Sequence, residues 1–453
     1  VENRVRLVRE LIEETKDAIG DTCAVAVRMA ADDGTGTPGH PVSAERREMF
    51  EILAELPDLW DVNVDNYEHE MGVSRFVQEA SLENTMNFVK AVTTKPVVSV
   101  GRFTSPDTMV SQVRRGIVDF IGAARPSIAD PFLPRKVEEG RVDEIRECIG
   151  CNICYTGDSL SVPIRCTQNP TMSEEWRRGW HPERIEPRSS DATVLVIGAG
   201  PAGLEATRAL GQRGYDVMLA EASTVLGGRV TQECKLPGLA EWGRVRDYRV
   251  NLIQTMPNVN IFLDNNLSAD DALSIGAQHI VVATGSKWRA DGFGRYHPTP
   301  CLNLGPAEQI FTPDDIFMGR IPQGRVVLFD DDHYYMGSVL AEALVEKGIE
   351  VCLVTPENMV SAWGMMTDEH YDNQQRIMQL GVEIIAAHGL DEFDGSYALL
   401  SCVYTQKPRS VAADAVLLVT SRTPSDKLYK ELAGKLESAA PESLPAPTLH
   451  KIG

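Results

Sequence analysis

The sequence predicts an α/β protein that combines the C-terminal half of a (β/α)8 barrel, a cysteine-rich loop and two Rossmann-like nucleotide-binding domains. Three observations predict this class. Strand and helix patterns alternate in the first third of the chain, four cysteines gather between positions 148 and 166, and a glycine motif follows an apolar strand. Because 453 residues exceed one compact core, we expect several domains, with the boundaries 1–145, 146–190, 191–320, 321–425 and 426–453.

The first 145 residues alternate short apolar runs with amphipathic helical patterns. Strands are expected at 23–29, 59–65, 96–102 and 119–125. Helical patterns occupy 1–21, 43–56 and 105–116. This alternation predicts a parallel sheet, and four such units form half of an eight-stranded barrel. Since the chain starts with Val1 inside a helix and stops on an apolar run, we expect a fragment without the first half of the barrel or the C-terminal tail.

Composition excludes several classes of partner. The formal net charge of -21 disfavours nucleic acid and anionic membranes, because both require basic patches. No apolar run reaches the roughly 18 residues of a membrane helix, and the charged N-terminal helix is not a signal peptide. Five cysteines scattered outside the cluster are typical of a reducing compartment, so we expect a cytoplasmic protein: Cys23, Cys234, Cys301, Cys352 and Cys402.

The four clustered cysteines have the spacing C-x2-C-x2-C-x11-C: Cys148, Cys151, Cys154 and Cys166. Three thiolates on one tight loop suit three corners of a [4Fe-4S] cluster, and the last cysteine can supply the fourth. A structural zinc usually takes two separated C-x2-C pairs, so zinc is a weaker alternative. Unliganded thiols are the remaining one.

The glycine motif Gly198, Gly200 and Gly203 lies between an apolar strand and a helix, and Glu221 closes the following strand. The first glycine permits a tight turn, the second admits a pyrophosphate, and the third lets helix and strand pack closely. The glutamate can accept hydrogen bonds from ribose hydroxyls. We therefore expect ADP or FAD here, with further contacts from Gly228 and Arg229 in the segment LGGRV.

A second strand–helix–strand unit covers 324–355, but Asp330, Asp331 and Asp332 stand where glycines would follow the first strand. Carboxylates at this turn would repel a pyrophosphate. The sequence thus predicts a domain that keeps the nucleotide-binding fold without binding a nicotinamide cofactor. Electrons are not expected to come from NADH.

Four segments together resemble the trimethylamine dehydrogenase group, a branch of the Old Yellow Enzyme flavoproteins that includes dimethylamine and histamine dehydrogenases and related N-demethylases. They are IGAARPSIADPFLPRKVEEGR, RECIGCNICYTGD, IRCTQNPTMSEEWRRGWHPE and GAGPAGLEA. The resemblance implies FMN in the barrel, a [4Fe-4S] cluster, and ADP or FAD in the first nucleotide domain. It also implies a homodimer that oxidises a small secondary or tertiary amine and passes single electrons to an electron-transferring flavoprotein.

Two other functions remain open at this stage. A broader group of relatives, the NAD(P)H-dependent 2,4-dienoyl-CoA and enoate reductases, passes electrons through the same cofactors in the opposite direction, inward from NAD(P)H. A zinc-stabilised nucleotide-binding module without enzymatic activity is the third hypothesis.

The resemblance also assigns roles to residues around the flavin. Arg28 matches the arginine that faces the N1/C2=O edge of the flavin, where its charge would stabilise the reduced form. Arg125 matches the arginine that binds the FMN phosphate, together with the backbone of Gly101, Arg102 and Ala124. Without the family, arginines at strand ends could equally be solvated.

Substrate residues are less clearly marked. Asp158 stands where the trimethylamine enzyme has a cage tryptophan, which suggests a protonated or polar amine, or else an exposed loop aspartate. Glu70 matches the family's active-site carboxylate most nearly, and Tyr67 and His69 are further candidates. Trp363 corresponds to an aromatic that faces the electron acceptor, or simply packs.

Overall fold

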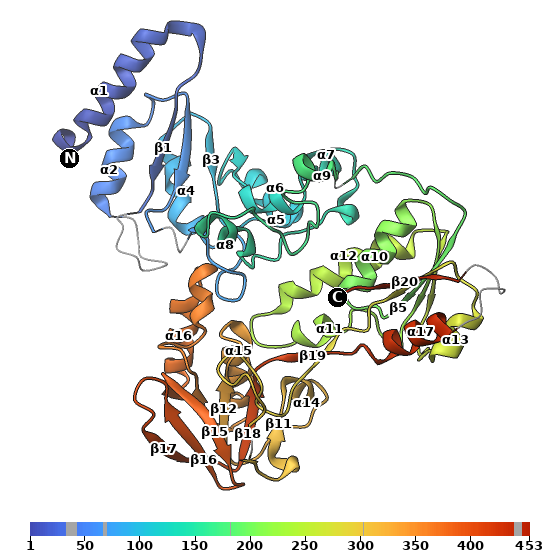
Figure 1. Cartoon of the computed structure of the whole chain (residues 1–453). Helices are drawn as coiled ribbons and strands as arrows, with labels where there is room; N and C mark the ends of the chain where they lie inside the picture. The colour runs from blue at the N-terminus through green and yellow to red at the C-terminus, as the bar shows by residue number, and fades with distance from the viewer. Residues whose placement is uncertain (33–42, 67–69, 182, 302, 439–445) are drawn as a thin grey trace. The chain divides into compact units, whose positions relative to one another are not determined.

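A computed structural model describes residues 1–32, 43–66, 70–181, 183–301, 303–438 and 446–453. The chain forms two compact units, Val1–Met172 and Ser173–Gly453, which we describe separately (Figure 1). The predicted α/β class is confirmed, since parallel sheets flanked by helices occur in both units. Two substrate candidates, Tyr67 and His69, lie outside the described residues.

The first unit contains a four-stranded parallel sheet in chain order. Its strands are β1 (Ala26–Ala30), β2 (Leu59–Asn63), β3 (Val97–Ser99) and β4 (Phe120–Ile121). The helices between and before them are α1 (Glu2–Ile19), α2 (Ala44–Leu53), α4 (Glu83–Val92) and α5 (Pro106–Arg114). All four predicted strands form, but the last is much shorter than the predicted range 119–125. It ends where Gly122 donates a backbone hydrogen bond to Ser99 and the chain turns into a helix.

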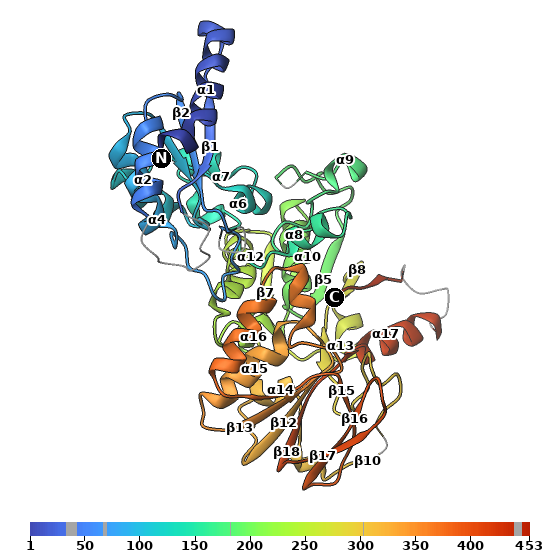
Figure 2. The ribbon, with the colours of Figure 1, turned by 90° about the vertical axis from the view of Figure 1, so that its left-hand side faces the viewer.

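Aromatic packing holds the helices on this sheet. Trp60 of β2 is fully buried, and its ring centroid lies 5.1 Å from that of Phe50 in α2. Phe50 in turn meets Phe88 of α4 edge-on at 5.4 Å. Figure 2 shows α2 and α4 beside the strands of this unit. The aromatic cluster is therefore part of the core that joins α2 and α4 to the sheet.

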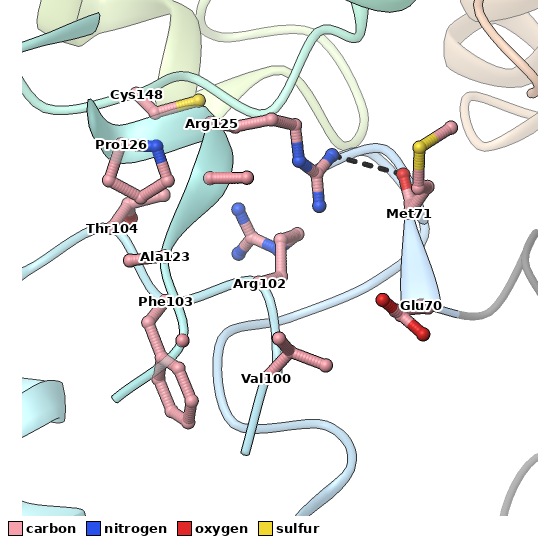
Figure 3. A pocket seen from close by; sticks show the side chains of 12 residues that line it. Glu70, Met71, Val100, Arg102, Phe103, Thr104, Ala123, Arg125, Pro126 and Cys148 are labelled. Atoms are coloured by element: carbon pink, nitrogen blue, oxygen red, sulfur yellow. Dashed lines mark hydrogen bonds between the residues drawn. The ribbon is translucent and has the colours of Figure 1, made fainter. Parts of the chain in front are cut away.

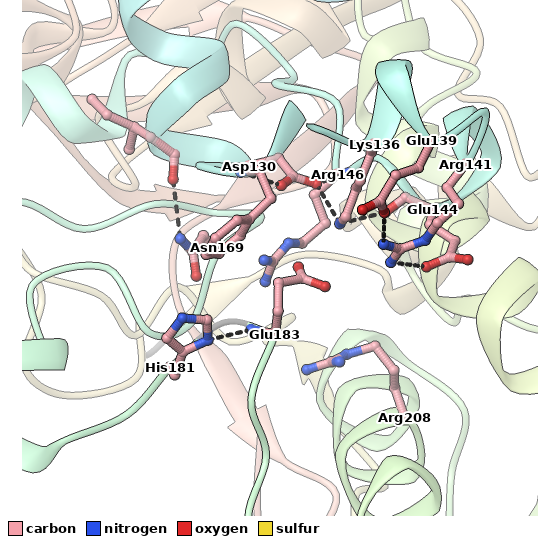
Figure 4. Close-up of polar contacts among 12 residues, drawn as sticks. Asp130, Lys136, Glu139, Arg141, Glu144, Arg146, Asn169, His181, Glu183 and Arg208 are labelled. Atoms are coloured by element: carbon pink, nitrogen blue, oxygen red, sulfur yellow. Dashed lines mark hydrogen bonds and ion pairs between the residues drawn. The ribbon is translucent and has the colours of Figure 1, made fainter. Parts of the chain in front are cut away.

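The cysteine loop follows two short helices, α6 (Ala124–Ala129) and α7 (Leu133–Glu138), and contains a third, α8 (Ile153–Ser159). A buried ion pair fixes the chain just before the loop (Figure 4). Lys136 donates to a carboxylate oxygen of Asp130 at 2.8 Å and to the carbonyl of Glu144 at 2.9 Å. The same carboxylate oxygen accepts the backbone N–H of Arg146 at 2.9 Å.

The first sheet of the second unit is five-stranded and parallel, in the order β20-β8-β5-β6-β7. Its strands are β5 (Thr193–Ile197), β6 (Asp216–Ala220), β7 (Val259–Phe262), β8 (His279–Val282) and β20 (Thr448–Lys451). The helices of this region are α9 (Glu175–Arg178), α10 (Pro201–Gln212), α11 (Val230–Glu233), α12 (Arg244–Gln254), α13 (Ala269–Ser274) and α17 (Lys427–Ser438).

A second parallel sheet has the order β11-β18-β12-β13-β14. Its members are β11 (Ile310–Phe311), β12 (Arg325–Asp330), β13 (Glu350–Val354), β14 (Glu383–Ile385) and β18 (Ala415–Val419), with helices α14 (Pro313–Phe317), α15 (Tyr335–Val345) and α16 (His370–Gln379). Another sheet, β10-β15-β16-β17, shares a buried core with it (Figures 1 and 2). Its strands are β10 (Asn303–Leu304), β15 (His388–Phe393), β16 (Tyr397–Cys402) and β17 (Pro408–Ala412). The antiparallel pair β9 (Ser286–Trp288) and β19 (Arg422–Pro424) completes the unit.

Loss of the buried lysine should destabilise the first unit strongly. We expect Lys136→Ala to lower the free energy of local opening by about 3–5 kcal/mol, because an uncompensated carboxylate remains buried. The neighbouring pair Arg135–Glu139 is exposed, so Arg135→Ala should cost less than about 1 kcal/mol. Hydrogen exchange of peptides from residues 120–170 measures both, and equal effects of the two variants would contradict the interpretation.

Candidate functional site

A cavity of about 130 Å³ adjoins the carboxyl ends of β3 and β4. Figure 3 shows the guanidinium groups of Arg102 and Arg125 in its wall, between the side chains of Cys148 and Glu70. Two guanidinium charges that share one cavity repel each other unless an anion lies with them. Their planar donor groups match phosphate oxygens. The cavity therefore suits a phosphate group.

The residues predicted to hold the FMN phosphate lie in this region. Arg102, Ala124 and Arg125 line the cavity, and Gly101 is flanked by two lining residues without lining it. Arg102 is buried and adopts a left-handed backbone conformation with φ 56°. Arg125 donates through Nη1 to the carbonyl oxygens of Met71 and Gly72 at 3.0 and 3.3 Å. Backbone carbonyls thus fix the direction of this guanidinium.

Arg28 and Glu70, the predicted flavin-facing arginine and active-site carboxylate, form an ion pair. Nη2 of Arg28 lies 3.0 Å from Oε1 of Glu70, and Nη1 lies 3.8 Å from Oδ2 of Asp61. The arginine side chain is 56% exposed, whereas that of Glu70 is 12% exposed and lines the cavity. Among the described residues, Oε2 of Glu70 is buried and makes no hydrogen bond. The pair therefore offers one oriented cation and one acceptor oxygen.

The four clustered cysteines surround a second, smaller cavity: Cys148, Cys151, Cys154 and Cys166. Within the described ranges, no three His, Cys, Asp or Glu side chains converge closely enough to hold one metal ion. Four thiols around a common space supply the ligand type that zinc and iron–sulfur clusters both use. Burial raises the thiol pKa of Cys148 to about 11 and that of Cys151 to about 12. Held as thiolates, these groups would need a cationic partner.

The loop backbone is specific to this arrangement. Gly150 has φ 62°, and a Cβ there would lie 3.0 Å from both Nη1 of Arg102 and Cβ of Ser74.

Asp158 lies on the exposed last turn of α8 and does not line either cavity of the first unit. The structure therefore does not bring it together with Glu70. Trp363, in the second unit, is half-buried with its ring centroid 5.3 Å from that of Tyr334.

A cavity of about 890 Å³ lies in the second unit. Gly198, Gly200, Glu221, Gly228 and Arg229 all line it. Strand β5 and helix α10 approach so closely at Gly203 that the Cβ of any residue replacing it would lie 1.8 Å from the carbonyl oxygen of Gly198. The N-terminus of a twelve-residue helix opens here, which favours an anionic group. Volume and lining together suit an ADP moiety.

The ribose-binding candidate Glu221 is already held in place. Its Oε2 accepts the backbone N–H of Ala199 at 2.7 Å, and its Oε1 accepts hydrogen bonds from the N–H and hydroxyl of Ser223. Both oxygens keep acceptor capacity for a ribose hydroxyl.

Glu233 was not singled out from the sequence, although it supports the same cavity. Its Oε1 lies 3.4 Å from Nη1 of Arg229, and its Oε2 accepts from the hydroxyl of Tyr335 at 3.4 Å. Burial raises the pKa of this glutamate. Only its position three residues after an apolar valine could have hinted at burial.

The corresponding turn after β12 is filled by carboxylates. Oδ1 of Asp330 accepts the backbone N–H groups of Asp332 and His333 at 3.2 and 3.1 Å. A Cβ at Gly337 would lie 2.5 Å from Oδ2 of Asp330, so the side chain occupies the space between strand and helix. Asp331 pairs with Nε2 of His333 at 3.0 Å. The carboxylate of Asp330 therefore already accepts hydrogen bonds from backbone N–H groups of this turn, which disfavours a pyrophosphate there.

Three family models match successive parts of the chain. Residues 1–144 match the NADH:flavin oxidoreductase / NADH oxidase family, 192–296 match the pyridine nucleotide-disulphide oxidoreductases, and 311–406 match the OYE-like second alpha/beta domain. Dimethylamine dehydrogenase of Hyphomicrobium sp. (strain x) is 38% identical over 464 residues, with 96% of this chain and 63% of the relative covered. The chain belongs to the trimethylamine dehydrogenase group.

Solved structures of this group superpose closely. The amine oxidase for 6-hydroxypseudooxynicotine from Pseudomonas geniculata N1 is 47% identical with a TM-score of 0.92, covering 100% of this chain and 67% of its own. Histamine dehydrogenase from Rhizobium sp. 4-9 is 48% identical with a TM-score of 0.93, covering 99% and 65%. The chain thus spans about two thirds of the length of these group members. No helix in the described residues is long and apolar enough to cross a membrane.

The close approach at Gly203 predicts a sharp effect on nucleotide retention. Gly203→Ala should reduce the adenine nucleotide released from the purified protein at least about tenfold, because the turn must open to admit a Cβ. Gly434→Ala is the control, since a Cβ there meets nothing within 4 Å. Chromatography of the acid-released nucleotide measures the effect, and normal nucleotide content in Gly203→Ala would contradict it.

The filled turn predicts a pH dependence of stability. Burial raises the pKa of Asp330 to about 7, so its contribution to stability is present below pH 4 and is lost as the pH rises to 7. His333 also has a raised pKa, so its contribution to stability is likewise lost as the pH rises. Asp331 and Asp332 are its acidic neighbours. Asp330→Asn should flatten the fall in urea stability between pH 5 and 8. The exposed Asp216→Asn should not, and an unchanged profile in Asp330→Asn would refute the assignment.

Proposed function

We propose that this protein is an FMN and iron–sulfur amine dehydrogenase or N-demethylase that oxidises a small secondary or tertiary amine. One observation carries the proposal: Cys148 and Arg125 line both the two-arginine cavity and the four-thiol cavity. A phosphate-binding cavity and a cluster-binding cavity with a common wall suit the passage of electrons from a flavin to a cluster.

The residues present fit the cofactors that the group implies. Arg102 and Arg125 would hold the FMN phosphate with the backbone near Gly101 and Ala124, and Arg28 would face the ring. The clustered cysteines would hold the [4Fe-4S] cluster, and the glycine turn with Glu221 and Arg229 would hold the ADP part of ADP or FAD. When bound, FMN accepts two electrons from an amine and the cluster passes electrons on one at a time.

The chain's own residues bind and orient the substrate. Glu70 is largely buried, and its Oε2 makes no hydrogen bond among the described residues. This oxygen can accept a hydrogen bond, or the proton itself, from a substrate ammonium. Arg28 pairs with the other oxygen and fixes the direction of the carboxylate.

The same proposal covers the partners. An electron-transferring flavoprotein would accept the electrons, and the protein would act as a cytoplasmic homodimer. An NAD(P)H-dependent enoate or 2,4-dienoyl-CoA reductase is the second candidate, favoured by the family model matched at residues 1–144. Asp330 argues against it, because its side chain occupies the turn where a pyridine nucleotide would bind in the second nucleotide-type domain.

An anaerobic substrate panel tests the proposal. Purified protein should contain iron, acid-labile sulfide and flavin, and its flavin absorbance should bleach with one or more amines from a set that includes dimethylamine, histamine, sarcosine and N-methylproline. NADH and NADPH should not bleach it on the same timescale. Bleaching by NADPH with no response to any amine would favour the reductase, and zinc in place of iron would contradict both.

A further inference from the structure

Asn152 occupies an unusual position in the cysteine loop. It stands directly after Cys151 in a left-handed conformation, φ 54° and ψ 13°, and is 1% exposed. Its carbonyl oxygen accepts the N–H of Thr156 at 3.2 Å, which opens the first turn of α8. That helix carries Cys154. The backbone of Asn152 therefore sets the course of the chain between Cys151 and Cys154, which carry two of the four thiols.

The side-chain amide of Asn152 joins two other segments. Its Oδ1 accepts a hydrogen bond from Nη1 of Arg125, and its Nδ2 donates to the carbonyl oxygen of Met71 at 2.7 Å. The same carbonyl accepts from Nη1 of Arg125 at 3.0 Å. The three groups form a closed triangle, which fixes the orientation of the amide because only one end can donate.

The triangle determines how Arg125 faces the first cavity. Nη1 makes the hydrogen bonds to Met71, Gly72 and Asn152, so the guanidinium plane is fixed before any anion binds. A fixed guanidinium binds phosphate better than a mobile one, since less side-chain freedom is lost on binding. One residue of the cysteine loop thereby prepares a cation for the neighbouring cavity.

The segment that contains Met71 contacts the cysteine loop at a second place that does not involve Arg125. The backbone N–H of Ser74 donates to the carbonyl of Gly150 at 2.9 Å, and its hydroxyl donates to the carbonyl of Ile149 at 2.6 Å. This contact joins the same two segments through hydrogen bonds that do not involve Arg125. It provides a matched comparison for the amide of Asn152.

We propose that Asn152 is a positioning residue that makes flavin binding and cluster binding cooperative. Its backbone shapes the loop for the cluster, while its amide holds Arg125 for the flavin phosphate. Each cofactor therefore stabilises the conformation that the other requires, and the coupling acts equally in both directions. The inference rests on the proposed function, because it assumes that FMN and the cluster occupy the two cavities.

The first test uses the wild-type protein alone. Protein produced under riboflavin limitation is separated into fractions of different flavin content, and the cluster's loss to a chelator is followed by its absorbance. We expect the flavin-poor fractions to lose the cluster several-fold faster, and to regain resistance when FMN is added. Equal rates in all fractions would overturn the inference.

The second test uses Asn152→Gly, which keeps a left-handed backbone without strain but removes the amide. Its iron content should stay close to that of the wild type, whereas its flavin-to-protein ratio, or the affinity of flavin-poor protein for FMN, should fall about tenfold. Ser74→Ala should leave flavin binding within about twofold. Normal flavin binding in Asn152→Gly, or an equal loss in Ser74→Ala, would overturn the inference.

The two proposals fail in different ways. Protein without iron or flavin would contradict the proposed function itself. Protein that binds both cofactors and oxidises an amine, but whose cluster lability ignores flavin content, would contradict the coupling alone. If Asn152→Gly does not fold, the wild-type fractions still test the coupling between the two cofactors, and equal rates of cluster loss would still overturn it.

Discussion

The arrangement of the first unit depends on how buried charge is compensated around Arg125. This arginine is fixed by the Met71 and Gly72 carbonyls and by the Asn152 amide, and it lines two adjoining cavities. On one side a second guanidinium, Arg102, shares its cavity, which suits an anionic group such as a phosphate. On the other side four cysteine thiols surround a smaller cavity.

The turns after β5 and β12 have the same strand–turn–helix backbone but differ in the residues that would meet a nucleotide. After β5, glycines let strand and helix approach until no side chain fits, and Glu221 is held beside the opening. After β12, Asp330 fills the equivalent space and bonds the turn's own N–H groups. The protein therefore satisfies those donors internally instead of offering them to phosphate. An electron flow that starts at an amine rather than at a nicotinamide agrees with this difference.

Sequence alone predicted the parts that depend on local spacing. The cysteine pattern, the glycine motif and the four parallel strands of the first unit all follow from residues close together in the chain, and the α/β class was correctly predicted. Contacts between distant segments were not accessible in this way. The Asn152 amide meets a carbonyl 81 positions away, and the Arg28–Glu70 pair spans 42 positions. One sequence cannot show which of many arginines and carboxylates become neighbours.

The sequence analysis was also incomplete for single residues whose exposure depends on their place in the fold. Asp158 was predicted from its distance to Cys154, but the short helix α8 turns its side chain to the exposed surface of the unit. Glu233 escaped notice because nothing in a four-residue helix marks a glutamate as buried, yet it lies beneath Arg229. Burial of single polar residues is a property of the packed fold rather than of the local pattern.

The central claim is that electrons from an amine reach the thiol-bound cluster by way of the flavin. Electron paramagnetic resonance of the purified protein, frozen after anaerobic mixing with an amine that bleaches the flavin, tests this most directly. The account predicts the signal of a reduced [4Fe-4S] cluster, close in intensity to that obtained with dithionite. A bleached flavin with no cluster signal, while dithionite still produces one, would contradict the account.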